Sequence, residues 1–245
     1  MANTQNIPWK RLAIEASAIV LSILLAFAID AWWEERQTEQ DIVEDLAIVE
    51  HELAENIRLV ELSIDIMTNI VAAKDRLIAE LKARPGSSSV DIPATDVFWG
   101  IFMNPTLDPS LGGTDAWIAA GQLGVIESPK LRQRLAGVRG KFDDTIEEQR
   151  IAREVGIRQI YPAIEDRGDI GIIKDMFAAG LHARQATEVQ EIPDFGSISL
   201  PNSGALIFSL QARGLWYEAS ILESTDLLAE LKEIQPLVQA EMRSK

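Results

Sequence analysis

The chain contains no cysteine and only two histidines, His51 and His182, among its 245 residues. The absence of cysteine excludes disulfide bonds, thiol catalysis and thiolate metal sites. The short motifs of zinc proteases, α/β-hydrolases and nucleotide-binding P-loops are also missing. A di-iron helical bundle needs Glu-x-x-His pairs, and neither histidine follows a glutamate at that spacing. We therefore predict that the protein is not an enzyme and uses no cofactor or metal.

Basic residues are few as well, because 23 Lys and Arg stand against 38 Asp and Glu, for a formal net charge of −15. Residues 1–33 contain two bases and two acids, so the whole excess of acid lies in residues 34–245. Such a surface repels nucleic acid, which we do not expect as a partner. Along the first long helix the acids, Glu52 among them, fill one side, which predicts a solvated face.

One long apolar run is present near the N-terminus, from Leu12 to Trp33. As a helix these 22 residues would rise about 33 Å, against a hydrocarbon thickness of about 30 Å. The uncharged part, Ala16–Ile29, also has the length of a signal-peptide core, and Ala26-Phe27-Ala28 has the form of a cleavage site. The helical pattern continues to Arg84 without Pro or Gly, which favours an uncleaved transmembrane helix over a removed signal.

Aromatic and charged residues flank the run and predict its orientation. The predicted membrane-interface anchors are Trp9, Lys10, Arg11, Trp32 and Trp33. By the positive-inside rule we expect residues 1–11 in the cytoplasm, residues 12–33 across the membrane, and residues 34–245 outside the cytoplasm. In a bacterium this arrangement places the anchor in the inner membrane and the bulk of the chain in the periplasm.

Small and polar residues recur on one side of the predicted transmembrane helix. This stripe consists of Glu15, Ala18, Ser22, Ala26 and Asp30. Small side chains at this spacing let a second helix approach closely, and polar ones can hydrogen-bond across. We interpret the stripe as a packing surface for another membrane helix, from a copy of the chain or from a partner. The alternative is that Asp30 lies at headgroup level and that Glu15 pairs with Arg11.

Helical periodicity dominates the rest of the chain, and the alternation typical of a substantial sheet is missing. The first helix carries apolar residues at steps of three and four as far as Arg84, where Pro85-Gly86 ends it. Ser128-Pro129 opens a second long helix towards Tyr161, and Asn202-Ser203 precedes the last one. We predict an all-α fold, with one N-terminal transmembrane helix plus an elongated extracytoplasmic helical bundle.

Shorter elements are expected between the long helices. Residues 95–103 predict an aromatic-rich helix, and Thr114 is a candidate N-cap of another, both of which would cap the far end of the bundle. A further helix fits residues 169–184, whereas residues 186–204 predict either a short strand or a loop. The apolar stripe predicted for the last helix is Leu206, Leu210, Leu215, Ala219, Leu222, Leu228, Leu231, Ile234 and Val238.

Three further features have chemical potential beside an ordinary explanation. Gly112-Gly113-Thr114 could hold an anion on free backbone amides, yet a turn into a capped helix also explains it. Asp143-Asp144 with Glu147-Glu148 lacks the glycine and loop geometry of a calcium site, which favours a surface cluster. Trp216 and Tyr217 are adjacent on a helix and point about 100° apart, so one of them is a candidate contact residue for a partner.

Two segments of the chain carry a family resemblance. Ala28–Arg36 reads A-I-D-A-W-W-E-E-R and leads into a long acidic helix, and Thr114–Ile126 contains Trp117, Gly121 and Leu123. Together they resemble a group of bacterial single-span membrane proteins whose anchor ends in a Trp-Trp-x-Glu-Arg motif. The resemblance implies a membrane-anchored helical domain outside the cytoplasm. It implies no activity, and no catalytic residues follow from it.

Two functions agree with these features. The first is a non-catalytic accessory or structural subunit that packs its transmembrane helix and periplasmic domain against a larger inner-membrane complex, for example a respiratory or photosynthetic one. The second is a periplasmic sensory or ligand-binding domain. It would signal laterally through a membrane partner, because the eleven residues before the span are too few for an output domain. A defined pocket with convergent polar residues would favour this second function.

Overall fold

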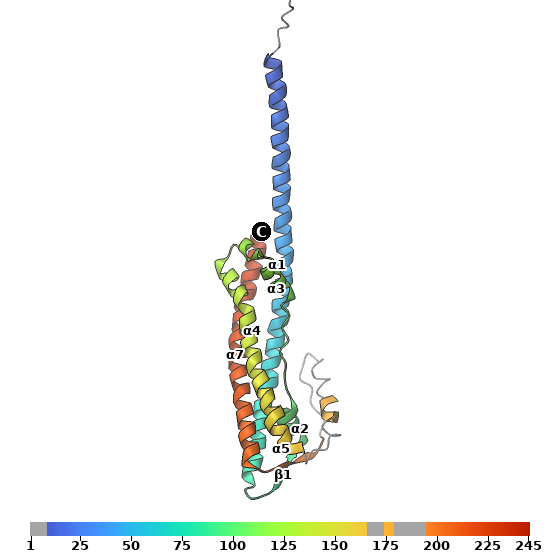
Figure 1. Cartoon of the computed structure of the whole chain (residues 1–245), viewed down its shortest axis with the longest axis vertical. Helices are drawn as coiled ribbons and strands as arrows, with labels where there is room; N and C mark the ends of the chain where they lie inside the picture. Colours follow the sequence, from blue (N-terminus) through green and yellow to red (C-terminus); the bar gives the residue numbers. More distant parts are fainter. Residues whose placement is uncertain (1–8, 166–173, 179–194) are drawn as a thin grey trace, which may run out of the picture.

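The computed structural model describes residues 9–165, 174–178 and 195–245, and for residues 9–13 it describes the backbone alone. Helices make up 84% of this part of the chain. The longest helix, α1, runs unbroken from Trp9 to Ala83, and Figure 1 shows it extending far beyond the bundle that packs on its second half. The helix ends where Pro85 and Gly86 follow, and Gly86 has a φ of +86°, which favours glycine.

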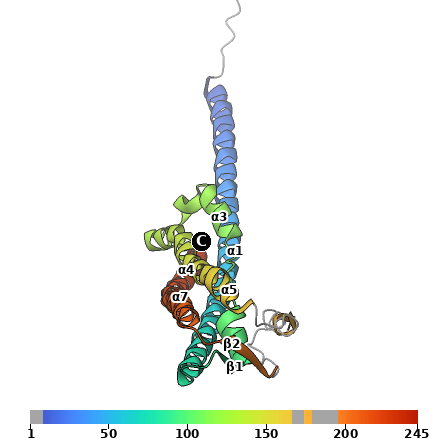
Figure 2. The same ribbon diagram turned by 60° about the horizontal axis from the view of Figure 1, so that its bottom comes forward.

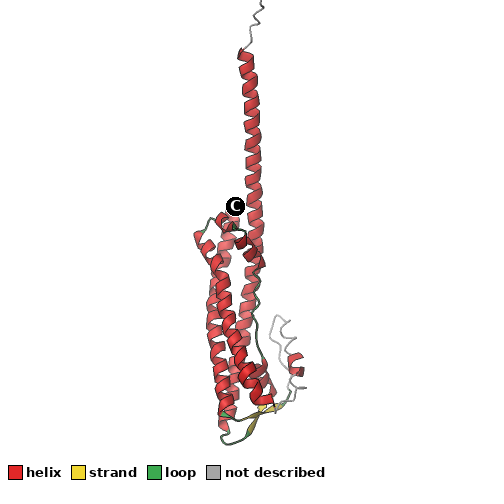
Figure 3. Ribbon diagram, viewed as in Figure 1, coloured by secondary structure: helices red, strands yellow, loops and turns green. Residues whose placement is uncertain are grey.

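The other elements are shorter, apart from two more long helices. In chain order they are β1 (Ser89–Pro93), α2 (Ala94–Val97), η1 (Phe98–Phe102), α3 (Gly112–Ala119), η2 (Gln122–Val125), α4 (Pro129–Val155), η3 (Gly156–Ile160), α5 (Tyr161–Ile164), β2 (Ser197–Pro201) and α7 (Gly204–Ser244). Residues 174–178 are helical too, and the rest of the helix predicted over 169–184 lies outside the described residues. Figure 3 shows how little of the molecule is strand.

The three long helices form the predicted bundle. Helix α7 runs antiparallel to both α1 and α4 and packs along each of them (Figures 1 and 2). Ion pairs join the surfaces of these helices: Lys232 on α7 lies 2.6 Å from Glu61 on α1, and Arg134 on α4 lies 3.0 Å from Glu230 on α7. Of the three long helices, α7 is therefore the one that packs extensively against both of the others.

The N-cap predicted for α4 is confirmed, and α7 begins directly after Asn202-Ser203, as predicted. The hydroxyl of Ser128 accepts a hydrogen bond from the Leu131 amide at 3.3 Å, and Pro129 follows at the first helical position. The hydroxyl of Ser203 accepts a hydrogen bond from the Leu206 amide at 3.1 Å. These local signals start α4 and α7 at the predicted residues.

The core consists of two apolar clusters, one in each half of the bundle. The proximal half, beside Ile42–Val60 of α1, buries Trp117, Phe142 and Leu231 among others. The distal half, beside Met67–Leu81, buries Phe98 and other residues of the short elements. The C-terminal end of α7 lies in the proximal half, next to the exposed part of α1 (Figure 1).

A layer of buried polar side chains separates the two clusters. Its members are Ser63, Thr145, Gln149, Ser220 and Ser224. The side-chain amide of Gln149 donates to Ser63 Oγ at 3.1 Å, and the hydroxyl of Ser220 donates to the Thr145 carbonyl at 3.4 Å. Gln149 Oε1 and Ser224 Oγ are buried without a protein hydrogen-bond partner. A buried polar atom without a protein partner contributes less to folding stability than a paired one, so these two atoms are the weak points of the layer.

A two-stranded antiparallel sheet closes the distal end. Val90 pairs with Leu200 and Ile92 with Ile198, and all four side chains are buried. The strand alternative for residues 186–204 is thus confirmed for Ser197–Pro201, while residues 186–194 lie outside the described chain. The partner strand β1 was not predicted, because its alternating pattern spans only five residues.

The short helices do not both lie at the distal end. Helix α2 and the π-helical turn η1 pack there, where Gly100 approaches Lys74 and Leu77 of α1. Helix α3 instead packs on the proximal half of α1, so the prediction for its position is wrong. Thr114 is also not its N-cap. Helix α3 begins at Gly112, so the N-cap position is Leu111, whose side chain makes no capping hydrogen bond.

The prediction for α7 is wrong at Leu215 and Leu222, which are exposed rather than in the core. The buried side of this part of α7 instead carries Arg213, Tyr217 and Ser220. Polar and aromatic side chains therefore occupy core positions, which simple apolar periodicity does not reveal.

Candidate functional site: the apolar segment of α1 and the base of the bundle

In the part of the chain that the structure describes, α1 is the one helix long and apolar enough to cross a membrane. Its most apolar window has a mean hydropathy of 2.0. Every side chain from Ile14 to Thr38 is exposed, so no described part of the chain packs against this segment. The segment has the length and composition of a membrane anchor, and a signal sequence would pass the same test.

The predicted small and polar stripe is intact on this exposed segment. Ala18, Ala26 and Asp30 are exposed, as is Glu15. The hydroxyl of Ser22 donates a hydrogen bond to the Ala18 carbonyl at 2.8 Å, within the same helix. Ser22 can therefore offer a partner helix its small size and its acceptor lone pairs, rather than its hydroxyl hydrogen.

The stripe lies on the side of α1 that faces away from the bundle. Ser22 and Ala26 each precede a core residue, Ile42 and Leu46, by 20 positions. Twenty residues make about five and a half helical turns, so the two pairs point in nearly opposite directions. A second helix on the stripe would meet no obstruction from α4 or α7.

The predicted interface anchors are only partly described. Trp32 and Trp33 are exposed, their rings meet edge to face at 6.4 Å between centroids, and the guanidinium of Arg36 lies 6.0 Å from the Trp32 ring. The helix already includes Trp9, Lys10 and Arg11, but their side chains lie outside the described residues. The aromatic pair thus lies about one helical turn before Arg36 and Glu39, the charged residues of α1 at the end of the bundle nearest the apolar segment, which we call its base.

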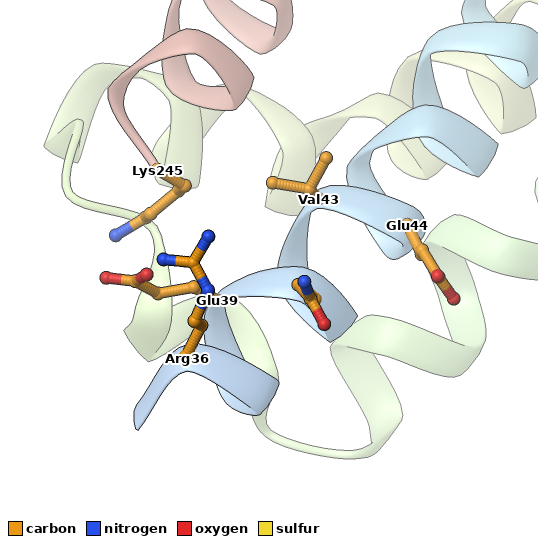
Figure 4. Close-up of a pocket in the computed structure, with 6 residues that line it drawn as sticks. Arg36, Glu39, Val43, Glu44 and Lys245 are labelled. Carbon is orange, nitrogen blue, oxygen red and sulfur yellow. The ribbon is translucent and has the colours of Figure 1, made fainter. Parts of the chain in front are cut away.

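An open pocket of about 420 Å³ lies at this base, between the start of the bundle on α1 and the end of α7. Its lining residues are Arg36, Glu39, Gln40, Val43, Glu44 and Lys245. Figure 4 shows Arg36, Glu39 and Lys245 gathered on one side, with Glu44 on the other. Lining charges of both signs make this pocket suited to polar molecules rather than apolar ones.

Ion pairing holds the end of α7 at the base. The Lys245 ammonium lies 2.8 Å from a Glu127 carboxylate oxygen, and this hydrogen bond raises the pKa of Lys245. The carboxylates of Glu241 and Glu39 raise the pKa further. Glu241 also accepts hydrogen bonds from the backbone amides of Glu127 and Ser128, immediately before α4. A carboxylate of α7 thus accepts hydrogen bonds from backbone amides at the N-terminal end of α4, where a negative charge is favourable.

Glu52 does the same for α3, contrary to the prediction that it lies on a solvated face. Glu52 is 7% exposed, and its carboxylate accepts hydrogen bonds from the amides of Gly113 at 2.6 Å and Thr114 at 3.0 Å. The Thr114 hydroxyl donates to it at 2.8 Å. The amides that the sequence offered as a candidate anion site are therefore occupied by the chain's own carboxylate.

Asn56, one turn after Glu52, fixes the segment before α3. Its side-chain amide donates to the Ser110 carbonyl, and its oxygen accepts from the Ser110 amide, both at 2.8 Å. Glu52 and Asn56 together form a polar clamp on residues 110–114. Neither residue stands out in the sequence, because a Glu and an Asn four positions apart on a charged helix usually face water.

Of the two candidate contact residues, Tyr217 is buried and Trp216 is half-buried. Tyr217 packs under Arg213, whose guanidinium lies 5.1 Å from the ring centroid. Arg213 donates to the carbonyl oxygens of Gly100 and Met103 and to Asn104 Oδ1, which explains how a buried cation is held at the end of η1. Only Trp216 keeps exposed surface that a partner could contact.

The carboxylates of α4 do not gather as one cluster. Glu147 pairs with Arg150, whereas Glu148 is half-buried. Burial raises the pKa of Glu148, and Glu223 on α7 raises it further. Within the described residues no three His, Asp or Glu side chains lie close enough together to hold a metal ion. His51 is exposed, and His182 lies outside the described residues.

These features define a mostly helical protein with one candidate membrane-spanning helix at its N-terminal end. Comparison of the chain with protein-family models, curated proteins and solved structures finds no match.

Proposed function

We propose that the protein is a non-catalytic, membrane-anchored accessory subunit of a larger inner-membrane complex. One observation carries the proposal: α1 is a single helix whose exposed apolar segment continues into the bundle core. No loop or break therefore separates the segment from the bundle. A partner that holds one of them also positions the other.

The proposal treats the apolar segment as a retained anchor. The candidate cleavage site at Ala26–Ala28 lies inside regular α-helix, whereas cleavage sites prefer an extended segment. In this arrangement residues 1–11 are cytoplasmic, residues 12–33 span the inner membrane, and residues 34–245 form the periplasmic domain. Sequencing of the mature N-terminus and protease treatment of intact spheroplasts test this topology. A mature chain that starts near Ile29, or a bundle that the protease cannot reach, would refute it.

The partner is proposed to bind through the stripe of Glu15, Ala18, Ser22, Ala26 and Asp30. It is an integral membrane complex or a second copy of the chain, with the lipid bilayer covering the rest of the helix. Because the stripe faces away from the bundle, the partner helix can approach α1 along the whole span. Alanine and serine allow a close approach, which is what drives helix association in lipid.

Paired leucine substitutions test the stripe. Ser22→Leu with Ala26→Leu adds bulk on the stripe, and Ser17→Leu with Ala28→Leu makes the same two exchanges on the opposite side of the helix. Each version is purified from its native membrane in mild detergent, and stoichiometric partners are identified by mass spectrometry. We expect the first pair to abolish co-purification and the second to leave it intact. Equal recovery of partners with both pairs would contradict the proposal.

The pocket at the base of the bundle favours a second candidate function, a ligand-binding domain that signals laterally. Charges of both signs line it, and the end of α7 meets α1 there, so an occupant would touch both helices. The variant Arg36→Ala distinguishes the two functions. Loss of a signalling output with partner binding intact would favour the sensory function, whereas an unchanged output would leave the accessory role as the better proposal.

A further inference from the structure

Helix α7 carries a second apolar stripe on its outer side, which its own bundle does not use. Phe208, Leu215 and Leu222 are exposed by 67%, 64% and 70% of their surfaces, and they recur every seven residues. Ala212 and Ala219 lie between them, so apolar residues alternate at steps of four and three. This is the spacing of a coiled-coil seam, with large residues at one core position and alanine at the other.

The other side of the same helix segment is already buried. Leu210, Tyr217 and Ser224 pack inside the bundle at these levels. A surface helix of a self-contained bundle has one apolar face and one polar face. This part of α7 has two faces fit for burial, and one of them is exposed in the described chain.

Lipid cannot cover the outer stripe if the protein is anchored as proposed above. Glu218 lies within the stripe's length and bonds to Lys74 of α1 at 3.1 Å, which fixes its height. Lys74 is 41 positions beyond Trp33 along one unbroken helix, a rise of about 60 Å. The stripe therefore stands far from the bilayer surface, which excludes membrane lipid as its occupant.

Charge decides what kind of protein fits. Glu218 is already paired with Lys74 of α1, so the acids left at the stripe are Glu223 and Asp226, and the only base of α7 in this region, Arg213, is buried. A second copy of the chain would bring the same acids to the same edges, where like charges repel. A partner helix with Lys or Arg beside its apolar seam would instead form interhelical ion pairs.

We propose that Phe208, Ala212, Leu215, Ala219 and Leu222 form a docking seam for an amphipathic helix of another protein, with apolar heptad positions flanked by basic residues. The two alanines let the helix axes approach closely, and the flanking acids select a basic partner. The inference builds on the proposed accessory role and supplies a periplasmic contact for the same complex.

Synthetic helices test the seam on the full-length chain in nanodiscs of zwitterionic lipid. One 28-residue peptide carries Leu and Ala heptads with Lys at the flanking positions, and a second carries Glu there. Fluorescence anisotropy is read against empty nanodiscs. We expect the Lys peptide to bind at least tenfold more tightly than the Glu peptide, and more weakly as salt rises. Equal binding of the two peptides, or no binding of either, would overturn the proposal.

Two substitutions locate the binding site. Leu215→Glu places a charge in the centre of the seam and should abolish binding of the Lys peptide. Ile157→Glu changes another exposed apolar residue, on η3, and should leave binding unchanged. Both positions are exposed, so circular dichroism should show intact folding. If Leu215→Glu binds as well as the parent chain, the seam is not the site.

A single cysteine tests for the alternative occupant. Leu215→Cys introduces the only thiol of the chain, and a disulfide-linked dimer under mild oxidation would show that a second copy covers the seam, against the proposal. These readouts concern α7 alone. Failure of the membrane anchor would instead appear as a chain that does not enter nanodiscs, or as unchanged co-purification after the leucine substitutions in α1.

Discussion

The clamp that Glu52 makes on α3 gives the sharpest test of the structure. Glu52→Gln keeps the size of the side chain but replaces one carboxylate oxygen by an NH₂ group. That group would face backbone N–H donors, because both carboxylate oxygens accept hydrogen bonds from Gly113 or Thr114. Glu52→Ala removes all three interactions and leaves the donors without a partner.

The size of the effect follows from burial. Hydrogen bonds to charged groups contribute about 1.5–3 kcal/mol each, and a buried donor left unpaired costs about 1–3 kcal/mol. Because Glu52 is 7% exposed, water can replace little of this. We expect Glu52→Gln to lower the free energy of unfolding by about 2 kcal/mol and Glu52→Ala by about 4 kcal/mol. The Gln variant is milder because its carbonyl oxygen still accepts one bond.

Glu55 provides the matched control. It lies on the same helix but is exposed, and it pairs with Arg58 within a turn. Glu55→Gln should therefore leave stability unchanged within error. Urea unfolding of the full chain in mild detergent, followed by tryptophan fluorescence, compares the three variants, and Trp117 in α3 reports locally because it is buried.

Amide hydrogen exchange separates the clamp from a general loss of stability. Glu52→Gln should speed exchange at Gly113 and Thr114 more than at amides in the middle of α4. If Glu52→Gln behaves like Glu55→Gln, or if the Gly113 and Thr114 amides keep their relative protection, Glu52 does not hold α3 in place.

Three further predictions concern buried and half-buried polar groups. Glu148→Gln should stabilise the protein at pH 7 but not below about pH 4. Because the pKa of Glu148 is raised in the folded state, the folded chain holds this proton more tightly than the unfolded chain, and stability falls as pH rises through that pKa. Thermal unfolding at several pH values should show a smaller decrease in melting temperature for the variant than for the parent chain. Ser224→Ala should raise the unfolding free energy by about 1 kcal/mol, since its buried hydroxyl has no protein partner; a loss in urea unfolding would imply a bond that the structure does not show. Arg213→Met should cost about 3 kcal/mol, because Gly100, Met103 and Asn104 lose their donor, and an unchanged melting temperature would contradict that role.

The sequence was sufficient for the long elements because their signals are local. Pro85 and Gly86 end α1, and Ser128 and Ser203 cap α4 and α7 with their own hydroxyls. Each of these signals acts within about one turn of helix, so it can be found without knowing the fold. The apolar run at the N-terminus is found in the same way, from composition and length.

The features that were missed depend on contacts between distant residues. Glu52 caps α3 across 61 positions in the sequence, and β1 exists because β2 pairs with it. Threonine is a frequent N-cap, so the sequence favours Thr114 in that role, but the carboxylate of Glu52 on α1 accepts the hydrogen bonds instead. The exposure of Leu215 and Leu222 was missed because periodicity shows that a stripe exists, not which neighbour covers it.

If α1 is anchored in a bilayer as proposed, its unbroken length makes it a lever. About 50 residues of it lie beyond Trp33, a length of roughly 75 Å. Membrane-spanning helices tilt by about 20° on average, and such a tilt would swing the distal sheet sideways by roughly 25 Å. With the anchor in a bilayer as proposed, a protein bound to the outer stripe of α7 would fix the angle at which the span crosses the membrane. A change in bilayer thickness that alters this tilt would in turn displace the distal end of the bundle.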